Sequence, residues 1–194
     1  MRRIFLVRHG EPEQHSGRIF LGQTNVPLSE RGREEARAAG EELAQLNANA
    51  AQVYASDLKR AFETAEIIAE ILGATVIPDK LFREMDMGSW DGELIDDIRE
   101  KFPEEYARRG EDILNYRIPG GENFYDLRSR VTREFYRVWQ TERAAPPRDL
   151  IIVAHLGVIR ALVAEILQDP DDDAFFRHYP TGSVVALDAP DWLL

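Results

Sequence analysis

The stretch Ile4-Phe5-Leu6-Val7-Arg8-His9-Gly10-Glu11, near the start of the chain, decides the fold. Four apolar residues pass directly into a charged pair, which predicts a buried strand that ends at Arg8 and His9. Gly10 would let the backbone turn sharply there, and a neutral imidazole beside a guanidinium suits a nucleophile beside an anion-binding group. Taken alone, such a short match is more often a strand end with a surface ion pair. A functional role for Arg8 and His9 therefore depends on further motifs in the chain.

The composition of the 194 residues, 44% hydrophobic and 30% charged, is typical of an ordinary globular protein with one domain. The formal net charge of -11 opposes non-specific binding to nucleic acid and to anionic membrane surfaces, so we expect neither partner. An anionic substrate would therefore need a local basic pocket.

The chain contains no cysteine, which excludes disulfides, thiolate zinc sites and cysteine catalysis and fits a reducing compartment. The apolar run of residues 4–7 is also far shorter than the core of a signal peptide, which needs about 7 to 15 residues. We therefore expect a cytoplasmic protein.

Apolar runs of strand length alternate along the chain with segments of helical periodicity. Strands are expected over residues 4–7, 52–55, 75–77, 150–154 and 183–187, and helices over 30–46, 58–72, 124–143 and 157–167. This alternation predicts an α/β fold, a three-layer α/β/α sandwich with a mostly parallel central sheet, and we expect residues 1–194 to form one domain. The run 150–154 is the most apolar and predicts a central strand that is buried on both faces.

Several segments outside the strands have a local interpretation. Ser29 is expected to cap the first helix, and Ser56 or Asp57 the second. The charge-dense residues 94–110, broken by Pro103, predict a solvated helical excursion, which with the residues up to 117 forms a lid-like insertion above the sheet edge. The acidic run 171–173 lacks the spacing of a calcium loop and is expected to be a solvated turn.

Polar residues follow three of the expected strands directly. Arg8 and His9 follow the first strand, Ser56 the second and His155 the run 150–154. Parallel strands point their carboxyl ends to one edge, and neighbours lie about 4.8 Å apart, so these side chains can converge on one small ligand. Arg60 lies one helical turn beyond Ser56 and can reach the same point.

Two arginines and two histidines around one point, in an acidic protein, suggest a pocket for a compact dianion such as phosphate. Attack by the neutral imidazole of His9 on phosphorus would give a phosphohistidine, while Arg8, Arg60 and a protonated His155 stabilise the charge without a metal. Glu84, in a loop with apolar neighbours, is the candidate proton donor for the leaving alkoxide.

Motifs along nearly the whole chain resemble those of the histidine phosphatase superfamily, which has the phosphoglycerate-mutase-like fold. The resemblance rests on Leu6–Glu11, Gly22–Gly32, Ser56–Ala65, Arg83–Gly92, Pro119–Glu122 and Val153–His155, which follow one another in the order of that family. By this resemblance, His9 is the phosphorylated nucleophile and Glu84 the proton donor, and Arg8, Arg60 and His155 bind the phosphoryl group.

The chain departs from the family pattern at four positions. Pro12 stands where relatives commonly carry Thr, and Asn25 replaces an Asp. His15 stands where an Asn often assists phosphate binding and is able to donate in its place. Leu156 replaces a Gly, but its backbone amide remains available to phosphate. We therefore count His15, Asn25 and Leu156, together with Ser56, as candidate substrate-binding residues.

Some neighbouring residues also have simpler structural interpretations. Ser56 and Glu122 are each placed to cap the helix that follows them as well as to contact a substrate. His178 and Tyr179 precede the last strand, where they could border the site, but a surface position is expected for both.

The resulting hypothesis is a metal-independent phosphomonoesterase that acts on a small phosphate ester without a cofactor. An α-ribazole phosphatase is the first candidate, because the Gly22–Ser29 segment resembles those enzymes. A phosphoglycerate mutase, a metal-dependent hydrolase with His9, His155 and Glu84 as ligands, and a non-catalytic phosphate-binding module remain as alternatives. The oligomeric state cannot be predicted from the sequence.

Overall fold

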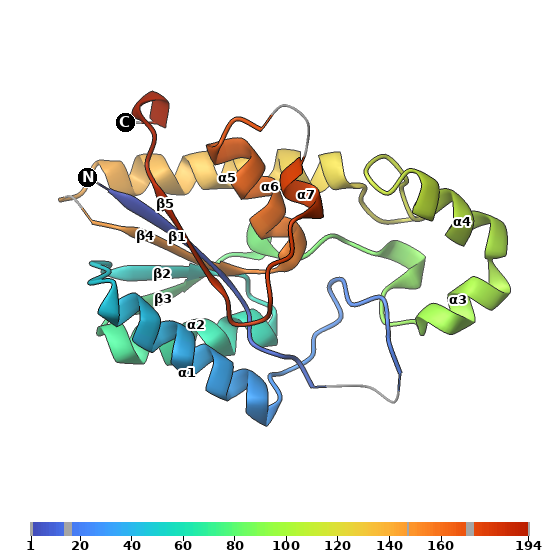
Figure 1. Ribbon diagram of the computed structural model, residues 1–194, viewed down its shortest axis with the longest axis horizontal. Coiled ribbons are helices and arrows are strands. Elements are labelled where there is room, and N and C mark those ends of the chain that lie inside the picture. Colours follow the sequence, from blue (N-terminus) through green and yellow to red (C-terminus); the bar gives the residue numbers. More distant parts are fainter. Residues whose placement is uncertain (1, 14–16, 147, 170–172, 194) are drawn as a thin grey trace.

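A computed structural model describes residues 2–13, 17–146, 148–169 and 173–193 of the chain. Its centre is one sheet of five strands in the order β3-β2-β4-β1-β5, whose strands are seen from the side in Figure 1. The strands are β1 (Arg3–Arg8), β2 (Gln52–Ala55), β3 (Thr75–Pro78), β4 (Leu150–Ala154) and β5 (Val184–Asp188). The first four run parallel and β5 pairs antiparallel with β1, which confirms the predicted mostly parallel sheet.

Helices cover both faces of the sheet and complete the predicted three layers (Figure 1). The covering helices are α1 (Glu30–Gln45) and α2 (Lys59–Leu72) on one face, and α5 (Phe124–Arg143) and α6 (Leu156–Ile166) on the other. Successive residues of β1 point to opposite faces, since side chains alternate along a strand. Phe5 and Val7 pack with residues of α1 and α2, whereas Ile4 and Leu6 pack with residues of α5 and α6.

Strand β4 lies between β2 and β1 and is buried along its whole length. The prediction of a central strand for residues 150–154 is therefore confirmed. Its position explains the sequence, because a parallel strand covered on both faces needs apolar side chains at every position. The residues that follow β4 consequently leave from the middle of the sheet edge.

Of the first two helices, one begins as predicted and the other does not. Ser29 caps α1 as expected, since its hydroxyl accepts the Gly32 N–H. The N-cap position of α2 is Leu58 rather than Ser56 or Asp57, and the α2 amide of Lys59 donates to Oδ1 of Asn25 at 2.8 Å. A distant loop therefore supplies the oxygen that a local N-cap normally provides.

Helix α5 is capped by a residue other than the one considered from the sequence. Asn123 and Asp126 form a capping box, in which each side chain accepts a backbone N–H of the other residue. Glu122 therefore does not cap α5, and its carboxylate is available for other contacts.

The expected excursion consists of α3 (Ile95–Lys101) and α4 (Pro103–Glu111), which extend beyond the sheet in Figure 1. Pro103 is the first residue of α4. This position tolerates proline, because a backbone N–H there would have no hydrogen-bond partner within the helix. A small apolar cluster joins this region to the main body through Phe20, Trp90, Ile98 and Ile118. Whether the excursion acts as a lid stays a prediction.

Other boundaries moved by one residue or gained short turns. Leu46 follows α1 as its C-cap and is 39% exposed, α6 begins at Leu156, and β5 begins at Val184. The irregular stretch 81–92 contains two 3-10 turns, η1 (Lys80–Phe82) and η2 (Gly88–Trp90). A short α7 (Asp173–Phe176) precedes β5, and a further 3-10 turn, η3 (Asp191–Leu193), follows it. Of the predicted turn 171–173, residues 171 and 172 lie outside the described residues, and Asp173 begins α7. None of the helices described has the length and apolar character needed to cross a membrane.

Candidate active site

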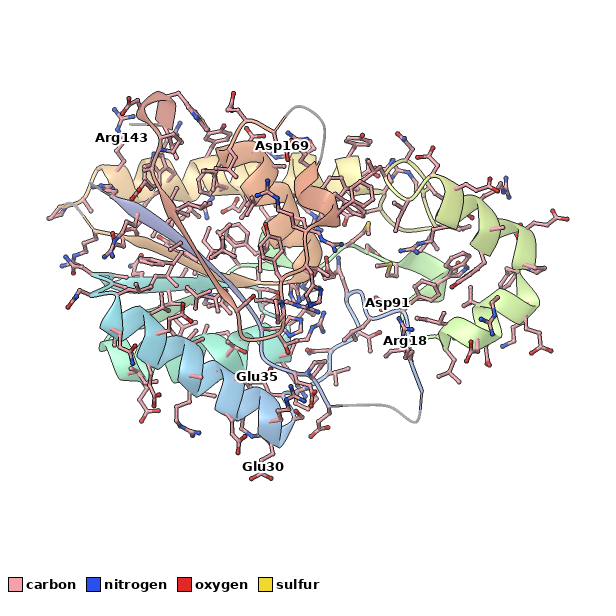
Figure 2. The ribbon with its side chains drawn as sticks, viewed as in Figure 1. Arg18, Glu30, Glu35, Asp91, Arg143 and Asp169 are labelled. Atoms are coloured by element: carbon pink, nitrogen blue, oxygen red, sulfur yellow. The ribbon has the colours of Figure 1, made fainter. Side chains whose placement is uncertain are left out.

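Three neighbouring strands end at one point and bring two histidines together there. His9 follows β1, His155 follows β4 and Ser56 follows β2, and β4 lies between the other two. The ring centroids of His9 and His155 are 5.0 Å apart, and Ser56 Oγ is 2.8 Å from Nε2 of His155. Figure 2 shows nitrogen-bearing side chains gathered at this end of the sheet, near the labelled Glu35.

The hydrogen bonds of His9 fix its tautomer. Nδ1 is 2.7 Å from the carbonyl oxygen of Gly10, which only accepts, so Nδ1 carries the proton. Nε2 accepts from Nε of Arg60 at 3.3 Å and therefore carries the lone pair. The imidazole thus presents an unprotonated nitrogen beside a fixed guanidinium, as a nucleophile requires.

Arg60 is held by a loop that folds over it. Its Nη2 donates to the carbonyl oxygen of Gly22 at 2.7 Å and its Nη1 to that of Thr24 at 2.9 Å. Asp91 fixes this loop in turn, since its carboxylate accepts the backbone N–H groups of residues 22, 23 and 24. The Arg60 guanidinium is therefore oriented before any ligand arrives.

Two buried polar atoms at the site have no hydrogen-bond partner in the part of the chain that the structure describes. They are Nε of Arg8 and Nδ1 of His155. Arg8 is anchored at its other end, where Nη1 donates to the Tyr179 carbonyl oxygen at 2.6 Å. Because an unpaired buried polar atom is costly, the two atoms indicate capacity for a polar ligand between these residues.

Burial and neighbouring arginines disfavour the charged form of both imidazoles, which opposes the protonated His155 expected from the sequence. Burial lowers the pKa of His9 well below its usual value, and the charges of Arg60 and Arg8 lower it further. The pKa of His155 is also lowered well below its usual value by burial, then by Arg60 and by His9. Burial lowers the pKa of Arg60 to about 10, which leaves its guanidinium charged at neutral pH.

The Glu84 carboxylate lies against the first turn of α6, which follows His155 in the chain. The carboxylate accepts the N–H of Met85 at 2.8 Å and that of Gly157, in the first turn of α6, at 3.2 Å. Its charge also raises the pKa of Arg8 and of Arg60, against the larger effect of burial, so it lies close to both guanidiniums. The carboxylate is consequently near the place where an anion between the arginines would lie.

The remaining candidates have different positions. Leu156 begins α6 directly after His155, so its amide lies at a helix N-terminus beside the site. Asn25 is exposed, and its side-chain oxygen is already occupied by the α2 amide of Lys59. Ser56 contacts His155, as described above, and His15 lies outside the described residues.

Three further residues support the site: Thr64 and Gln23, which had no predicted role, and Tyr179, for which a surface position was expected. Thr64 Oγ1 accepts the Gly10 N–H at 3.1 Å and donates to the Arg60 carbonyl oxygen, four residues earlier on α2. This spacing was a usable signal, since such residues share a helix face. Gln23 Nε2 donates to the Glu84 carbonyl oxygen at 3.3 Å. Tyr179 acts through its backbone carbonyl, which no side-chain pattern reveals, while the neighbouring His178 is exposed as expected.

The charge at this point favours an anion over a cation. Arg8 and Arg60 place two positive groups against His9 and His155, which opposes the metal-ligand role considered for the histidines. Among the described residues, no group of three His, Asp or Glu side chains is arranged to hold a metal ion.

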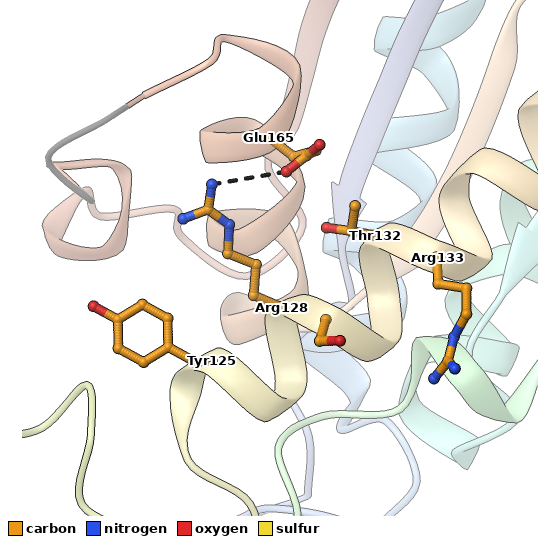
Figure 3. A pocket seen from close by; sticks show the side chains of 6 residues that line it. Tyr125, Arg128, Thr132, Arg133 and Glu165 are labelled. Atoms are coloured by element: carbon orange, nitrogen blue, oxygen red, sulfur yellow. Dashed lines mark ion pairs between the residues drawn. The ribbon is translucent and has the colours of Figure 1, made fainter.

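A separate open pocket of about 420 Å³ lies over α5 and α6 (Figure 3). Its lining includes Tyr125, Thr132 and Arg133, and Arg128 pairs there with Glu165 at 3.7 Å. None of the residues described above lines it, so this pocket is not part of the histidine site.

Fold and site together define an enzyme of the histidine phosphatase type. A model of the histidine phosphatase superfamily (branch 1) matches residues 4–191, and the chain therefore belongs to this superfamily. Among curated proteins, it is 34% identical over 174 residues to the probable phosphoglycerate mutase GpmB of Salmonella paratyphi C, covering 88% of this chain and 77% of that protein.

Solved structures of phosphatases resemble the whole fold. A mycobacterial glucosyl-3-phosphoglycerate phosphatase is 30% identical with a TM-score of 0.84, covering 95% of this chain and 89% of that chain. The α-ribazole phosphatase of Shigella flexneri is 26% identical with a TM-score of 0.85, covering 97% and 91%. The phosphoglycerate-mutase-like fold predicted from the motifs is thereby confirmed.

Proposed function

We propose that this protein is a metal-independent phosphomonoesterase that hydrolyses a small phosphorylated metabolite through a phosphohistidine at His9. The observation that carries the proposal is the lone pair on Nε2 of a buried, uncharged His9, directly beside the guanidinium of Arg60. A nucleophile and an anion-binding group are thus in place at the same point. The unpaired Nε of Arg8 and Nδ1 of His155 provide two further contacts for phosphoryl oxygens.

In the first step, the Nε2 lone pair of His9 forms a bond to phosphorus and the ester P–O bond breaks. The electron pair of that bond goes to the leaving oxygen, which takes a proton from the Glu84 carboxylic acid and departs as an alcohol. The arginines stabilise the charge on the equatorial oxygens, as fixed cations do in phosphoryl transfer. The products are phospho-His9 and the Glu84 carboxylate.

In the second step, water attacks the phosphorus while the Glu84 carboxylate accepts its proton. The N–P bond breaks, its electron pair returns to Nε2 of His9, and inorganic phosphate leaves. The Nδ1–H bond to the Gly10 carbonyl keeps the ring oriented through both steps. Acid and base are therefore the same residue in opposite protonation states.

The substrate class proposed is an alkyl phosphate monoester of a small metabolite. The similarity to phosphatases of α-ribazole and of glucosyl-3-phosphoglycerate supports such a substrate. We assign the specificity contacts to the α3–α4 excursion, because the motifs do not cover it. The similarity to GpmB favours a mutase as the second candidate. Product analysis separates the two, since only a phosphatase releases inorganic phosphate in proportion to substrate consumed.

Trapping of the phosphoenzyme tests the proposal. Wild-type protein mixed with a ³²P-labelled monoester and quenched in base should carry label that acid removes, as phosphohistidine does. His9→Ala should carry no label and lose at least about 10⁴-fold in turnover, as expected for a lost nucleophile. The matched control is His178→Ala, which changes an exposed histidine and should label normally. Full activity of His9→Ala would refute the proposal.

A further inference from the structure

Arg130 of α5 holds the loop that carries Glu84. Its Nη1 donates to the carbonyl oxygens of Leu81 at 2.7 Å and of Arg83 at 3.1 Å. Its Nη2 donates to the carbonyl oxygen of Glu84 itself at 3.3 Å. One half-buried side chain from a helix therefore contacts three backbone carbonyl groups, that of the proposed proton donor Glu84 and those of two residues just before it.

Glu122 completes this contact from the other side. Arg130 Nε donates to its Oε1 at 2.8 Å and Nη2 donates to its Oε2 at 2.7 Å, in a two-point geometry. Oε2 also accepts the Asp86 N–H at 3.1 Å, and the Glu122 N–H donates to the Asp86 carbonyl oxygen at 2.9 Å. The Arg130–Glu122 pair thus holds the chain on both sides of Glu84.

No donor of the Arg130 guanidinium remains for a substrate. A guanidinium has five N–H groups, and those of Arg130 make five hydrogen bonds: one from Nε, two from Nη1 and two from Nη2. The loop between η1 and η2 is not part of the sheet, so its backbone carbonyl groups are held by these hydrogen bonds and not by a neighbouring strand. The turn before α5 also packs closely against this loop. A side chain at Gly121 would collide with the Asp86 carbonyl oxygen, so the two backbone segments can approach only because residue 121 is glycine.

We infer that Arg130, through its pair with Glu122, is the positioning residue that sets the place of the Glu84 carboxyl group relative to the leaving oxygen. The inference rests on the proposed role of Glu84 as proton donor. Its consequence is selective: loss of Arg130 impairs the protonation of the leaving group more than the binding of phosphate. Lysine cannot substitute, because it keeps the charge but has no planar fork.

The test compares kcat/KM for two monoesters in the same protein sample. Glycerol 2-phosphate has a poor leaving group that needs a proton, whereas p-nitrophenyl phosphate releases a stable phenolate that does not. Glu84→Gln should lose about 10²- to 10⁴-fold on glycerol 2-phosphate and far less on the aryl ester. Arg130→Lys should lose roughly 10- to 100-fold on the alkyl ester and no more than about threefold on the aryl ester.

Arg128→Lys is the matched control. Arg128 lies two residues earlier on α5 and pairs with Glu165 at the separate pocket (Figure 3). Its substitution should leave the ratio of the two kcat/KM values unchanged. The double variant Glu84→Gln/Arg130→Lys should show no further change in this ratio, because both changes act on the same proton transfer.

The outcomes separate this inference from the proposed function. Equal losses on both esters in Arg130→Lys, while Glu84→Gln retains its selectivity, would mean that Arg130 is only structural and would overturn the inference. Absence of selectivity in Glu84→Gln would instead overturn the proton-donor role on which it rests. If Arg130→Lys does not fold, Glu122→Gln answers the same question, and a non-selective loss there also overturns the inference.

Discussion

The carboxyl edge of the sheet and the Glu84 loop border the same site but hold their residues in different ways. At the sheet edge, His9 and His155 directly follow β1 and β4, whose positions are fixed by parallel ladders and by helices on both faces. In the loop, Glu84 lies between two short 3-10 turns and is fixed by side chains from elsewhere, above all Arg130.

The difference teaches which part of the chemistry depends on the architecture. The proposed nucleophile His9 and its neighbour His155 are positioned by the fold itself, so they persist as long as the sheet does. Glu84, the proposed proton donor, is positioned by a few long-range polar contacts, so its position can be lost while the fold remains intact. Asp91 connects the two regions, because it belongs to the loop side and fixes residues 22–24, whose carbonyls hold Arg60.

The largest effect is expected at the sheet edge. Arg60→Ala removes the guanidinium that contacts His9 and should lower kcat/KM by about 10²- to 10³-fold, as loss of a charge-stabilising donor does elsewhere. Steady-state kinetics with p-nitrophenyl phosphate measure it. Lys59→Ala removes the same charge from an exposed neighbour and is the control. Similar losses in both variants would show that the overall charge, not the position of Arg60, matters.

An intermediate effect is expected where the two regions meet. Asp91→Ala frees the backbone N–H groups of residues 22–24 and so loosens the carbonyls that orient Arg60. Affinity for inorganic phosphate, measured as its inhibition constant, should fall about tenfold, because only part of the roughly 1.5 to 3 kcal/mol of a charged hydrogen bond reaches the phosphate through Arg60. Asp96→Ala, which removes an exposed carboxylate of α3, should leave it unchanged. An unchanged inhibition constant in Asp91→Ala would show that the sheet edge binds phosphate independently of the loop side.

The smallest effect is expected on stability as the pH falls. His9 and His155 are buried and uncharged in the folded protein, with lowered pKa values, while the unfolded chain titrates near pH 6.5. Below pH 6.5 the unfolded state therefore binds more protons, and stability should fall by about 1 kcal/mol for each imidazole between pH 6.5 and 5.5. Urea unfolding measures this slope. His9→Gln should remove about half of it, and an unaltered slope would contradict the burial argument.

The sheet and the meeting of its strand ends could be predicted because both depend on local patterns. Apolar runs of strand length, separated by helical periodicity, determine a parallel α/β fold. Once the strands are parallel, a polar residue directly after each one must lie at a common edge. The pattern therefore predicts that Arg8, His9, Ser56 and His155 lie together, and the last three do so through direct contacts.

The contacts that support the site could not be predicted in this way. Asn25 supplies the oxygen at the start of α2 from 34 residues away, and Tyr179 holds Arg8 from 171 residues away. Such contacts join a side chain to a distant backbone group, so they leave no periodicity in the sequence. The capping box of α5 is different, since Asn123 and Asp126 are three residues apart and their pattern is visible in the sequence.

The reversed direction of β5 has a consequence for how this site can change. Because β5 runs opposite to β1, the residues that enter it, and not those that leave it, reach the catalytic end of the sheet. Tyr179 and Gly182 contact Arg8 from this incoming segment, outside every parallel ladder. Insertions between residues 177 and 181 would therefore remodel the entrance to the phosphate site while the register of the parallel strands stays intact, which makes this corner the place to graft a new specificity.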